Sequence, residues 1–352
     1  MALNFIRPTI RQMDGYAPGE QPAAGTRIIK LNTNENPFPP SPRVMEAIRN
    51  VPAEHLRRYP DPAGRGFCAA AGKVLGFAPD WLITGNGSDD VLAFALSAFC
   101  APGDILAYPD PTYSLYPVLA EINEVSVRPV PWLEGWRLPT DDLLKTGARA
   151  IFLANPNAPS GTFVEPEEIE KLAQRFDGVV LVDEAYADFA ESNCLELVRR
   201  NENVVVSRTL SKAYSLAGLR FGFAVAQPQV IAELNKARDS YPCDAISIAS
   251  ATAAIDDQPY ARMTWDHVKA ERARMTDELT KMGWEVIPSQ SNFLFAAPPD
   301  GRGRECYEHL KGKGILVRFF DKPQQRDKVR ISIGTTEENG AVLAELREYF
   351  GK

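Results

Sequence analysis

The sequence predicts an α/β fold, with a large domain followed by a smaller α/β domain. Short runs of purely apolar residues, such as 179–182 and 204–206, are typical of strands buried on both faces of a parallel sheet. These runs alternate with helical patterns. Beyond residue 245 a long charged helix is followed by closely spaced strands. We therefore expect an arm over 1–42, a large domain over 43–245 and a smaller domain over 246–352.

Charge and hydropathy exclude several classes of protein. A net charge of −7 without a Lys/Arg block argues against nucleic-acid binding. The first residues lack the apolar core of a signal peptide, and the longest apolar run, 91–101, is too short to span a bilayer. The five cysteines are scattered without C-x-x-C spacing, as expected for buried thiols in a reducing compartment. We expect a cytoplasmic protein. Its three distant histidines, His55, His267 and His309, predict neither a metal site nor a histidine-based triad.

The N-terminal part begins with an arm whose asparagines and Glu35 are able to line a site. A helix is expected from Ser41, with Pro42 at its first position. The expected elements that follow are a helix over 66–78, a strand over 81–84, a turn over 85–90 and a helix over 91–100.

The turn 85–90, Gly-Asn-Gly-Ser-Asp-Asp, has three interpretations. A strand, a Gly-rich turn and a helix start together present backbone N–H groups and a helix dipole to a phosphate. A dinucleotide fingerprint fails, because Asp90 stands where a third glycine is required. A plain turn with Ser88 or Asp89 as the helix N-cap is the third interpretation. On this segment alone, the first and third both stay open.

Three strands of this part end in polar or aromatic groups. The strand over 105–108 leads into a loop with two prolines that presents Tyr113, which suits either stacking on a flat heterocycle or a place in the core. The strand over 150–153 leads into 155–161, where many turn-forming residues indicate a shaped loop. The strand over 179–182 ends at Asp183, where a carboxylate is costly unless it is paired. Strands are expected over 105–108, 124–129, 150–153 and 179–182, and helices over 114–121 and 166–176.

Asp183 has three interpretations as well. An acid here is able to hold a protonated pyridine nitrogen. A magnesium-binding pair with Glu184 is the rival, but no G-x-x-x-x-G-K-[ST] motif precedes it. A solvated strand end is the third.

Lys212 follows the next buried strand, 204–206, at what we expect to be the ligand-binding edge of the sheet. A lysine partly removed from water has a lowered pKa and is a nucleophile towards a carbonyl. The hydroxyls around it and Arg220 suit a phosphate. This combination predicts pyridoxal phosphate (PLP) held as a Schiff base. A surface lysine is the alternative, since most lysines are exposed.

The smaller domain is predicted from one long helix and four strands. Arg330 lies in the last strand between apolar neighbours, as either a solvent-facing residue or an anion clamp. Thr335 and Glu338 form the pattern of a capping box before the final helix, 342–350. The other expected elements are a helix over 260–282 and strands over 284–287, 292–296, 315–319 and 329–333.

Together these motifs resemble fold-type I PLP-dependent aminotransferases, and most closely the histidinol-phosphate aminotransferase group. The run S-K-x-x-x-L-x-G-x-R-x-G at 211–222 follows N-G-S-D, P-T-Y, N-P-N-x-P-S-G and V-D-E-A-Y in order, and the resemblance extends from about Tyr16 to the C-terminus. It implies a large domain with a mostly parallel seven-stranded sheet between helices, plus a smaller α/β domain.

The resemblance also implies roles in binding the cofactor. Lys212 is similar to the lysine that binds PLP and moves the proton at the substrate Cα, Asp183 to the acid at the pyridine nitrogen, and Tyr186 to the tyrosine at the ring oxygen. Tyr113 resembles the stacking aromatic residue. The implied phosphate site consists of the main chain of Ser88 and Asp89 with Thr209, Ser211 and Arg220.

Further implied roles concern the substrate and a second subunit. Tyr59 resembles the tyrosine that reaches the phosphate of the other subunit's cofactor, which implies a homodimer. Arg330 resembles the arginine that binds the carboxylate of glutamate or 2-oxoglutarate. The implied substrate pocket also contains Tyr16, Asn34, Glu35, Asn292, Phe293 and Arg318.

The loop 155–161 departs from the family pattern. That pattern has an asparagine directly before P-T-G, bonded to the cofactor's ring oxygen, whereas this chain has Ala158 there and Ser160 in place of threonine. Either Asn157 takes the role by a local shift, or Tyr186 holds the oxygen with less help. We expect Asn157.

The implied activity is reversible transamination of histidinol phosphate with 2-oxoglutarate, in histidine biosynthesis, with Lys212 as general acid–base. An aromatic amino-acid aminotransferase and a threonine-phosphate decarboxylase are alternatives on the same scaffold, because each substrate presents an anion to Arg330 or Arg318. A non-catalytic regulatory module is disfavoured, since no DNA-binding domain is appended. A nicotinamide dehydrogenase is disfavoured by Asp90.

Overall fold

A seven-stranded sheet forms the larger part of the computed structural model, which describes residues 5–22 and 28–351. The strand order is β2-β8-β7-β6-β5-β3-β4, and all neighbours are parallel except β8, which runs antiparallel to β2 and β7. The predicted mostly parallel sheet of seven strands is confirmed, although β8 itself was not expected. The strands are β2 (Leu82–Gly85), β3 (Ile105–Asp110), β4 (Ser126–Pro131), β5 (Ala150–Ala154), β6 (Val179–Asp183), β7 (Val204–Thr209) and β8 (Gly222–Val225).

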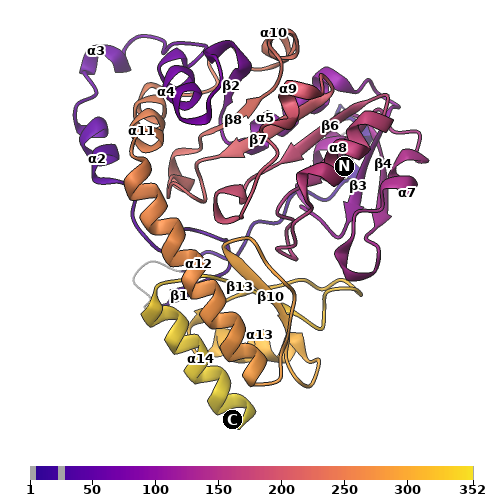
Figure 1. Ribbon diagram of the computed structural model, residues 1–352, viewed down its shortest axis with the longest axis vertical. Coiled ribbons are helices and arrows are strands. Elements are labelled where there is room, and N and C mark those ends of the chain that lie inside the picture. The colour runs from indigo at the N-terminus through magenta and orange to yellow at the C-terminus, as the bar shows by residue number, and fades with distance from the viewer. Residues whose placement is uncertain (1–4, 23–27, 352) are drawn as a thin grey trace.

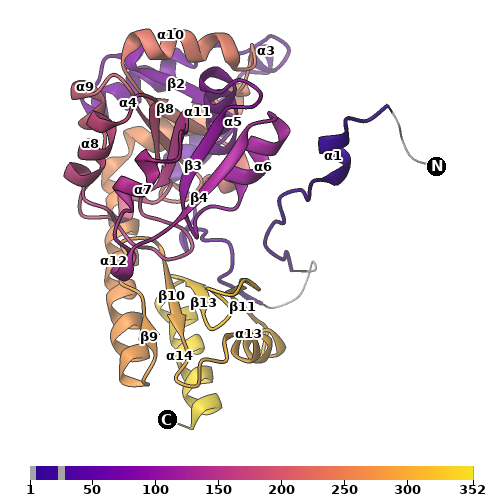
Figure 2. The same ribbon diagram turned by 90° about the vertical axis from the view of Figure 1, so that its right-hand side faces the viewer.

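Side chains of the central strands alternate between two cores. In β5, Ile151 and Leu153 enter one core while Phe152 enters the other, as expected for a strand with period two that is covered on both faces. Figure 2 shows α8 and α9 on one side of the sheet, and α5 and α6 on the other. One core includes α5 (Ser88–Phe99), α6 (Leu115–Ile122) and α10 (Pro228–Ala237); the other includes α4 (Arg65–Leu75), α7 (Thr140–Leu144), α8 (Pro166–Arg175), α9 (Leu197–Arg200) and α11 (Ala245–Asp256).

The register of the parallel strands brings their carboxyl ends to one edge. Ala154 of β5 pairs with Asp183 of β6, which in turn pairs with Ser207 of β7. Strand β7 continues to Thr209, three residues beyond the predicted strand, so its polar end is still part of the sheet. Open parallel sheets bind ligands at this edge.

Two smaller sheets and three further helices lie outside the large sheet and its covering helices. One sheet is antiparallel, with the order β12-β13-β10-β9, and the other pairs β1 with β11 in parallel. The expected strand 315–319 is therefore divided between two sheets. Figure 1 shows α12 running from beside α11 to the smaller sheets. The elements are β1 (Ile29–Lys30), β9 (Glu285–Val286), β10 (Phe293–Ala297), β11 (Ile315–Leu316), β12 (Arg318–Phe319), β13 (Val329–Ser332), α12 (Gln258–Lys281), α13 (Gly303–Gly312) and α14 (Thr336–Phe350).

Helix starts follow the predicted chemistry with one exception. Ser41 caps α2 by accepting from the N–H of Arg43, and Thr335 with Glu338 forms the capping box of α14. The N-cap of α5 is Gly87, not Ser88 or Asp89. None of the described helices combines the length and apolar composition needed to cross a membrane. The remaining short helices are α1 (Pro8–Gln12), α2 (Pro42–Arg49), α3 (Ala53–Leu56) and the 3₁₀ turns η1 (Pro79–Trp81), η2 (Glu134–Trp136), η3 (Ala187–Phe189) and η4 (Ala217–Leu219).

The turn before α5 packs directly against the start of β8. A Cβ atom on Gly222 would lie 2.4 Å from the carbonyl carbon of Gly87 and 2.4 Å from the nitrogen of Ser88. Gly87 itself has a φ of +87°, a conformation that glycine adopts without strain. The two glycines thus let the β2–α5 turn and the β7–β8 connection share one corner of the sheet edge.

Gly222→Ala should lower the free energy of unfolding by about 1–3 kcal/mol, because its methyl group overlaps backbone atoms that cannot move independently. Urea unfolding measures the effect. Gly218→Ala is the matched control, since a Cβ there meets no atom within 4 Å. Equal stability of the two variants would contradict the close approach.

Candidate active site

A cavity of about 270 Å³ lies where the carboxyl edge of the large sheet meets the segment 32–34 and the antiparallel sheet. Residues from all three regions line it, although they are far apart in sequence. Of the predicted site residues, the structure brings together Tyr16, Asn34, Ser88, Asp89, Tyr113, Asp183, Tyr186, Thr209, Ser211, Lys212, Arg220, Arg318 and Arg330.

Lys212 lies three residues beyond the end of β7, and its amine donates a hydrogen bond to the carbonyl oxygen of Thr33 at 2.8 Å. Burial lowers the pKa of this amine to about 8, and the positive charges of Arg330 and Arg220 act in the same direction. A much larger fraction of the amine is therefore neutral at physiological pH than for an exposed lysine. A neutral amine is the form that attacks a carbonyl or accepts a proton.

Asp183 ends β6 inside the protein, with 3% of its surface exposed. Its Oδ2 accepts a hydrogen bond from the hydroxyl of Tyr116 at 3.0 Å, whereas Oδ1 has no partner in the described chain. Burial raises the pKa of the carboxyl group to about 7, and the Tyr116 bond opposes this rise. An unpaired buried oxygen is costly, so it marks a place where a donor is expected to bind.

Arg220, Ser211 and the first turn of α5 form one corner of the cavity. Arg220 donates to Ser211 Oγ at 3.3 Å and to Asp89 Oδ2 at 3.0 Å, and the hydroxyl of Tyr113 donates to Asp89 Oδ1 at 3.0 Å. The backbone N–H groups at a helix start lack partners within the helix and carry the positive end of its dipole. This corner has the groups that bind a phosphate.

A second cationic region comes from the antiparallel sheet. Arg318 of β12 and Arg330 of β13 are directly paired across neighbouring strands, and both line the cavity. Arg330 lies over the rings of Phe293 and Phe320, at 5.1 and 5.4 Å from their centroids. Like charges directly opposite each other destabilise a sheet, and an anion bound between the two guanidinium groups would offset this repulsion.

The structure turns Asn157 away from the cavity. Its amide oxygen accepts from Thr112 at 2.8 Å, and its amide nitrogen donates to the carbonyl of Pro111 at 3.1 Å and to Ser160 Oγ at 2.8 Å. Ala158 lines the cavity in its place. The expectation that a local shift brings Asn157 to the site is thus at odds with the geometry, because the amide already satisfies its own loop.

Four other predicted residues do not line the cavity. Asn292 bonds to the carbonyl of Asn34 at 2.9 Å, Phe293 lies beneath Arg330, and Glu35 pairs with Lys30. Tyr59 is 79% exposed and stacks on Tyr241, with ring centroids 4.4 Å apart. Asn292 and Phe293 thus contact groups of the site from behind, whereas Glu35 contacts Lys30 and Tyr59 is outside the cavity.

Sequence reasoning missed several lining residues. Phe320, Lys322 and Gln325 belong to the turn between β12 and β13, where no periodic pattern or motif marks them. Tyr116 of α6, which bonds to Asp183, was missed as well; its place three residues after Tyr113 is a weak signal.

The sequence model of the family described as aminotransferase class I and II matches residues 26–346. The chain belongs to this family. It is 48% identical over 346 residues to a histidinol-phosphate aminotransferase of Syntrophotalea carbinolica, covering 98% of this chain and 99% of that one. It is 45% identical over 345 residues to histidinol-phosphate aminotransferase 1 of Trichormus variabilis, covering 98% and 99%.

The fold is also similar to a solved structure of the same kind. The crystal structure of histidinol-phosphate aminotransferase from Sinorhizobium meliloti, in complex with pyridoxal-5'-phosphate, superposes with a TM-score of 0.91. The two sequences are 26% identical, and the match covers 99% of this chain and 98% of that one.

Asp183→Asn should flatten the pH dependence of stability in ligand-free protein. The carboxyl pKa is about 7 in the folded chain and 3.8 for an ordinary aspartate, so its contribution to stability is complete below pH 3.8 and is lost as the pH rises through 7. Between about pH 4 and pH 8 we expect the free energy of unfolding of the wild type to fall by about 2–4 kcal/mol relative to that of the variant, measured by urea unfolding.

The control for this measurement is Asp80→Asn, at an exposed position, which should leave the slope unchanged. If Asp183→Asn did not alter the slope of the free energy of unfolding against pH, the buried carboxyl group would not hold its proton in this range.

Proposed function

We propose that the chain catalyses reversible transamination with pyridoxal phosphate as cofactor, histidinol phosphate as amino donor and 2-oxoglutarate as acceptor. The observation that carries the proposal is one cavity that combines a low-pKa lysine, a buried acid with an unpaired oxygen, and two separate cationic regions. The names of the relatives, at up to 48% identity over nearly the whole chain, support the choice of substrate.

The side chains of the cavity fit this cofactor. A protonated pyridine N–H would satisfy Oδ1 of Asp183, and the start of α5 with Arg220 suits the phosphate group. Tyr113 offers an aromatic face and Tyr186 a hydroxyl. The proposed cofactor ligands are Ser88, Asp89, Tyr113, Asp183, Tyr186, Thr209, Ser211, Lys212 and Arg220.

The cofactor, when bound, supplies a ring that spreads the negative charge left on the substrate Cα after proton loss. Lys212 is the group that accepts this proton and returns it, because its amine is partly neutral near pH 8. The carbonyl of Thr33 holds the Lys212 amine in place. Tyr116 fixes the Asp183 carboxylate through Oδ2 and leaves Oδ1 to bind the ring nitrogen.

The second cationic region is suited to the anionic group of each substrate. Histidinol phosphate and glutamate both carry an amine and an anion, so Arg318 and Arg330 are able to serve both halves of the cycle. Lys322 adds a third positive charge to the same wall. The cavity also contains Tyr16 and Asn34. We propose Tyr16 as a further substrate contact, with Asn34, Glu35, Asn292 and Phe293 acting by holding their neighbours in place.

Lys212→Ala should reduce turnover of histidinol phosphate with 2-oxoglutarate by roughly 10³-fold or more, because the group that moves the proton is gone. The same variant should lose covalent attachment of the cofactor, measured as protein mass after borohydride reduction. Lys171→Ala, at an exposed lysine, is the matched control and should keep both properties. Retention of both by Lys212→Ala would refute the proposed role.

The choice of substrate is tested on the wild-type protein by a comparison of three amino donors. Histidinol phosphate, phenylalanine and threonine phosphate are each mixed with the protein, and the absorbance change of the bound cofactor is followed together with CO₂ release. We expect the highest kcat/KM with histidinol phosphate. A preference for phenylalanine would indicate an aromatic aminotransferase, and CO₂ from threonine phosphate would indicate a decarboxylase.

We propose in addition that 43–245 and 246–352 are two domains, with the arm 1–42 against the site between them. The separation of the large sheet from the two smaller sheets supports this division. The described part of the arm reaches the cavity through Tyr16 and Asn34.

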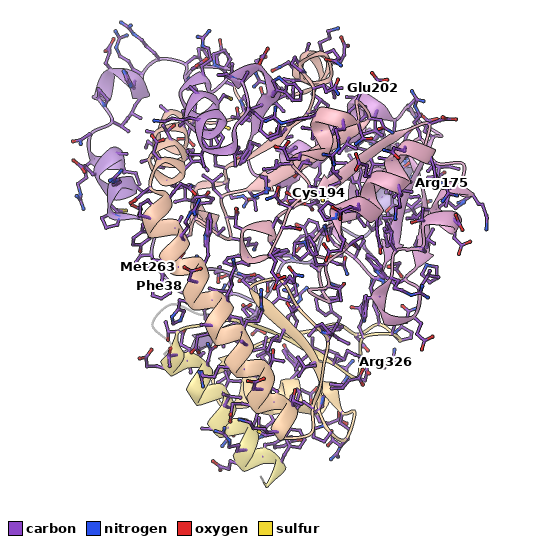
Figure 3. The ribbon with its side chains drawn as sticks, viewed as in Figure 1. Phe38, Arg175, Cys194, Glu202, Met263 and Arg326 are labelled. Carbon is purple, nitrogen blue, oxygen red and sulfur yellow. The ribbon has the colours of Figure 1, made fainter. Side chains whose placement is uncertain are left out.

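We further propose a cytoplasmic homodimer in which Tyr59 reaches the cofactor phosphate of the other subunit. Exposed apolar side chains support an interface on the edge formed by α2 and α3 (Figure 1): Met45, Leu56 and Tyr59 are 42%, 59% and 79% exposed. Met263, 52% exposed, lies lower on the same edge (Figure 3). All five cysteines are buried thiols, Cys194 in the interior being labelled in Figure 3, which suits a reducing compartment.

Leu56→Glu should shift the protein towards monomer in sedimentation, because a charge would be buried in the interface. Leu133→Glu, at a side chain that is 40% exposed directly before η2, should leave the dimer intact. Tyr59→Phe should stay dimeric but bind the cofactor about 5–10-fold more weakly, through loss of one hydrogen bond. Unchanged cofactor affinity in Tyr59→Phe would place Tyr59 outside the cofactor site.

A further inference from the structure

Asn34 is held in a single orientation by bonds to all of its polar groups. Its backbone φ is +57°, a left-handed conformation that asparagine tolerates, and 1% of its surface is exposed. Its N–H donates to Ser332 Oγ at 3.0 Å, and its carbonyl accepts from Asn292 at 2.9 Å. Because Ser332 Oγ accepts from that N–H, the serine's own proton donates to Oδ1 of Asn34, at 3.0 Å. The amide nitrogen of Asn34 therefore points the other way.

That amide nitrogen donates to the hydroxyl of Tyr186 at 3.0 Å. Tyr186 lines the cavity, with its ring edge-on to Phe293 at 5.1 Å between centroids. Within the described residues, Asn34 is the one hydrogen-bond partner of this hydroxyl. A phenol oxygen that accepts from an amide has its own proton available to donate elsewhere, which here is into the cavity. Burial raises the pKa of Tyr186, although Arg330 and Asn34 lower it, so the hydroxyl remains a donor at neutral pH.

The loop 155–161 offers no amide donor near this hydroxyl. The side-chain amide of Asn157 is bonded to Thr112, Pro111 and Ser160, and Ala158, which lines the cavity, has no polar side-chain atom. The hydroxyl of Tyr186, oriented by Asn34, is thus a donor that the site contains independently of that loop.

We propose that Asn34 is a positioning residue that acts through Tyr186: it directs the Tyr186 proton to the ring oxygen of the cofactor and compensates for the missing asparagine at Ala158. The inference rests on the proposed function, since it requires that PLP binds in this cavity. The inference concerns the direction of two consecutive hydrogen bonds. The Asn34 amide donates to the phenol oxygen of Tyr186, whose proton is then donated to an acceptor; a carboxylate at position 34 would reverse the first of these bonds.

The test is a double-mutant cycle between positions 34 and 186. Asn34→Asp keeps the shape, the tolerance for positive φ and the oxygen that faces Ser332, but replaces the donor by an acceptor for the Tyr186 proton. We expect the dissociation constant of PLP from the holoenzyme to rise about tenfold with Tyr186 present, the size of one hydrogen bond to a charged group. In a Tyr186→Phe background the same change should have less than about a twofold effect.

Two further variants keep the test decisive. Asn34→Gly removes the side chain while preserving the positive φ, and should show the same dependence on Tyr186 if the aspartate variant folds poorly. Asn32→Asp places the same charge on the same cavity wall, two residues away, and should have equal effects in both backgrounds. Asn34→Asp should move the pH midpoint of the bound cofactor's absorbance relative to wild type. The same substitution added to Tyr186→Phe should leave that midpoint where Tyr186→Phe alone has it.

Equal fold-changes in the two backgrounds would overturn the inference and assign Asn34 to holding the segment 32–34 alone. That outcome is distinct from failure of the proposed function, in which the wild-type protein would not bind PLP covalently in the borohydride assay.

Discussion

Three successive carbonyl groups of the segment 32–34 join the two halves of the site. Asn32 accepts from Arg330 of the antiparallel sheet at 3.1 Å, and Thr33 accepts from Lys212 at the edge of the large sheet at 2.8 Å. Asn34 accepts from Asn292, just before β10, at 2.9 Å. Each bond satisfies a backbone carbonyl and holds a polar side chain at or behind the site. The position of this short segment therefore determines where the lysine and the arginine stand relative to each other.

The buried charges divide into those that the fold satisfies and those that it leaves to a ligand. Behind the site, Arg208 donates to Glu184 at 2.8 Å and to Asp188 at 3.0 Å, so this cluster is paired internally. In the cavity, by contrast, Oδ1 of Asp183 and Nε of Arg330 have no partner in the described chain. Unpaired groups of this kind reduce the stability of the ligand-free protein. They are the ones that a bound cofactor and an anionic substrate would satisfy, which is why perturbed groups gather at active sites.

The sequence by itself determined the fold and the chemistry at the edge of the large sheet. Short apolar runs rich in β-branched residues, such as 179–182, favour strands covered on both faces, and the register of parallel strands then brings their carboxyl ends together. Asp183 was predicted as a site residue because it directly follows such a run, and Lys212 because it follows the next strand among hydroxyl groups and Arg220, in a motif that resembles the family's. The caps at Ser41 and Thr335 were predictable for the same reason, since they depend on neighbours within a few residues. The domain boundaries stay a prediction.

Only the tertiary structure decided which polar groups meet. Asn157 is a natural candidate by its place in the loop, but partners from 111–112 and 160 use its whole amide, and no local pattern reveals that competition. Tyr116 and Asn34 reach Asp183 and Tyr186 across separations of 67 and 152 residues. Sequence patterns specify burial and secondary structure, because those depend on local periodicity. A hydrogen bond depends on distances of about 3 Å between segments that only the packed chain brings together.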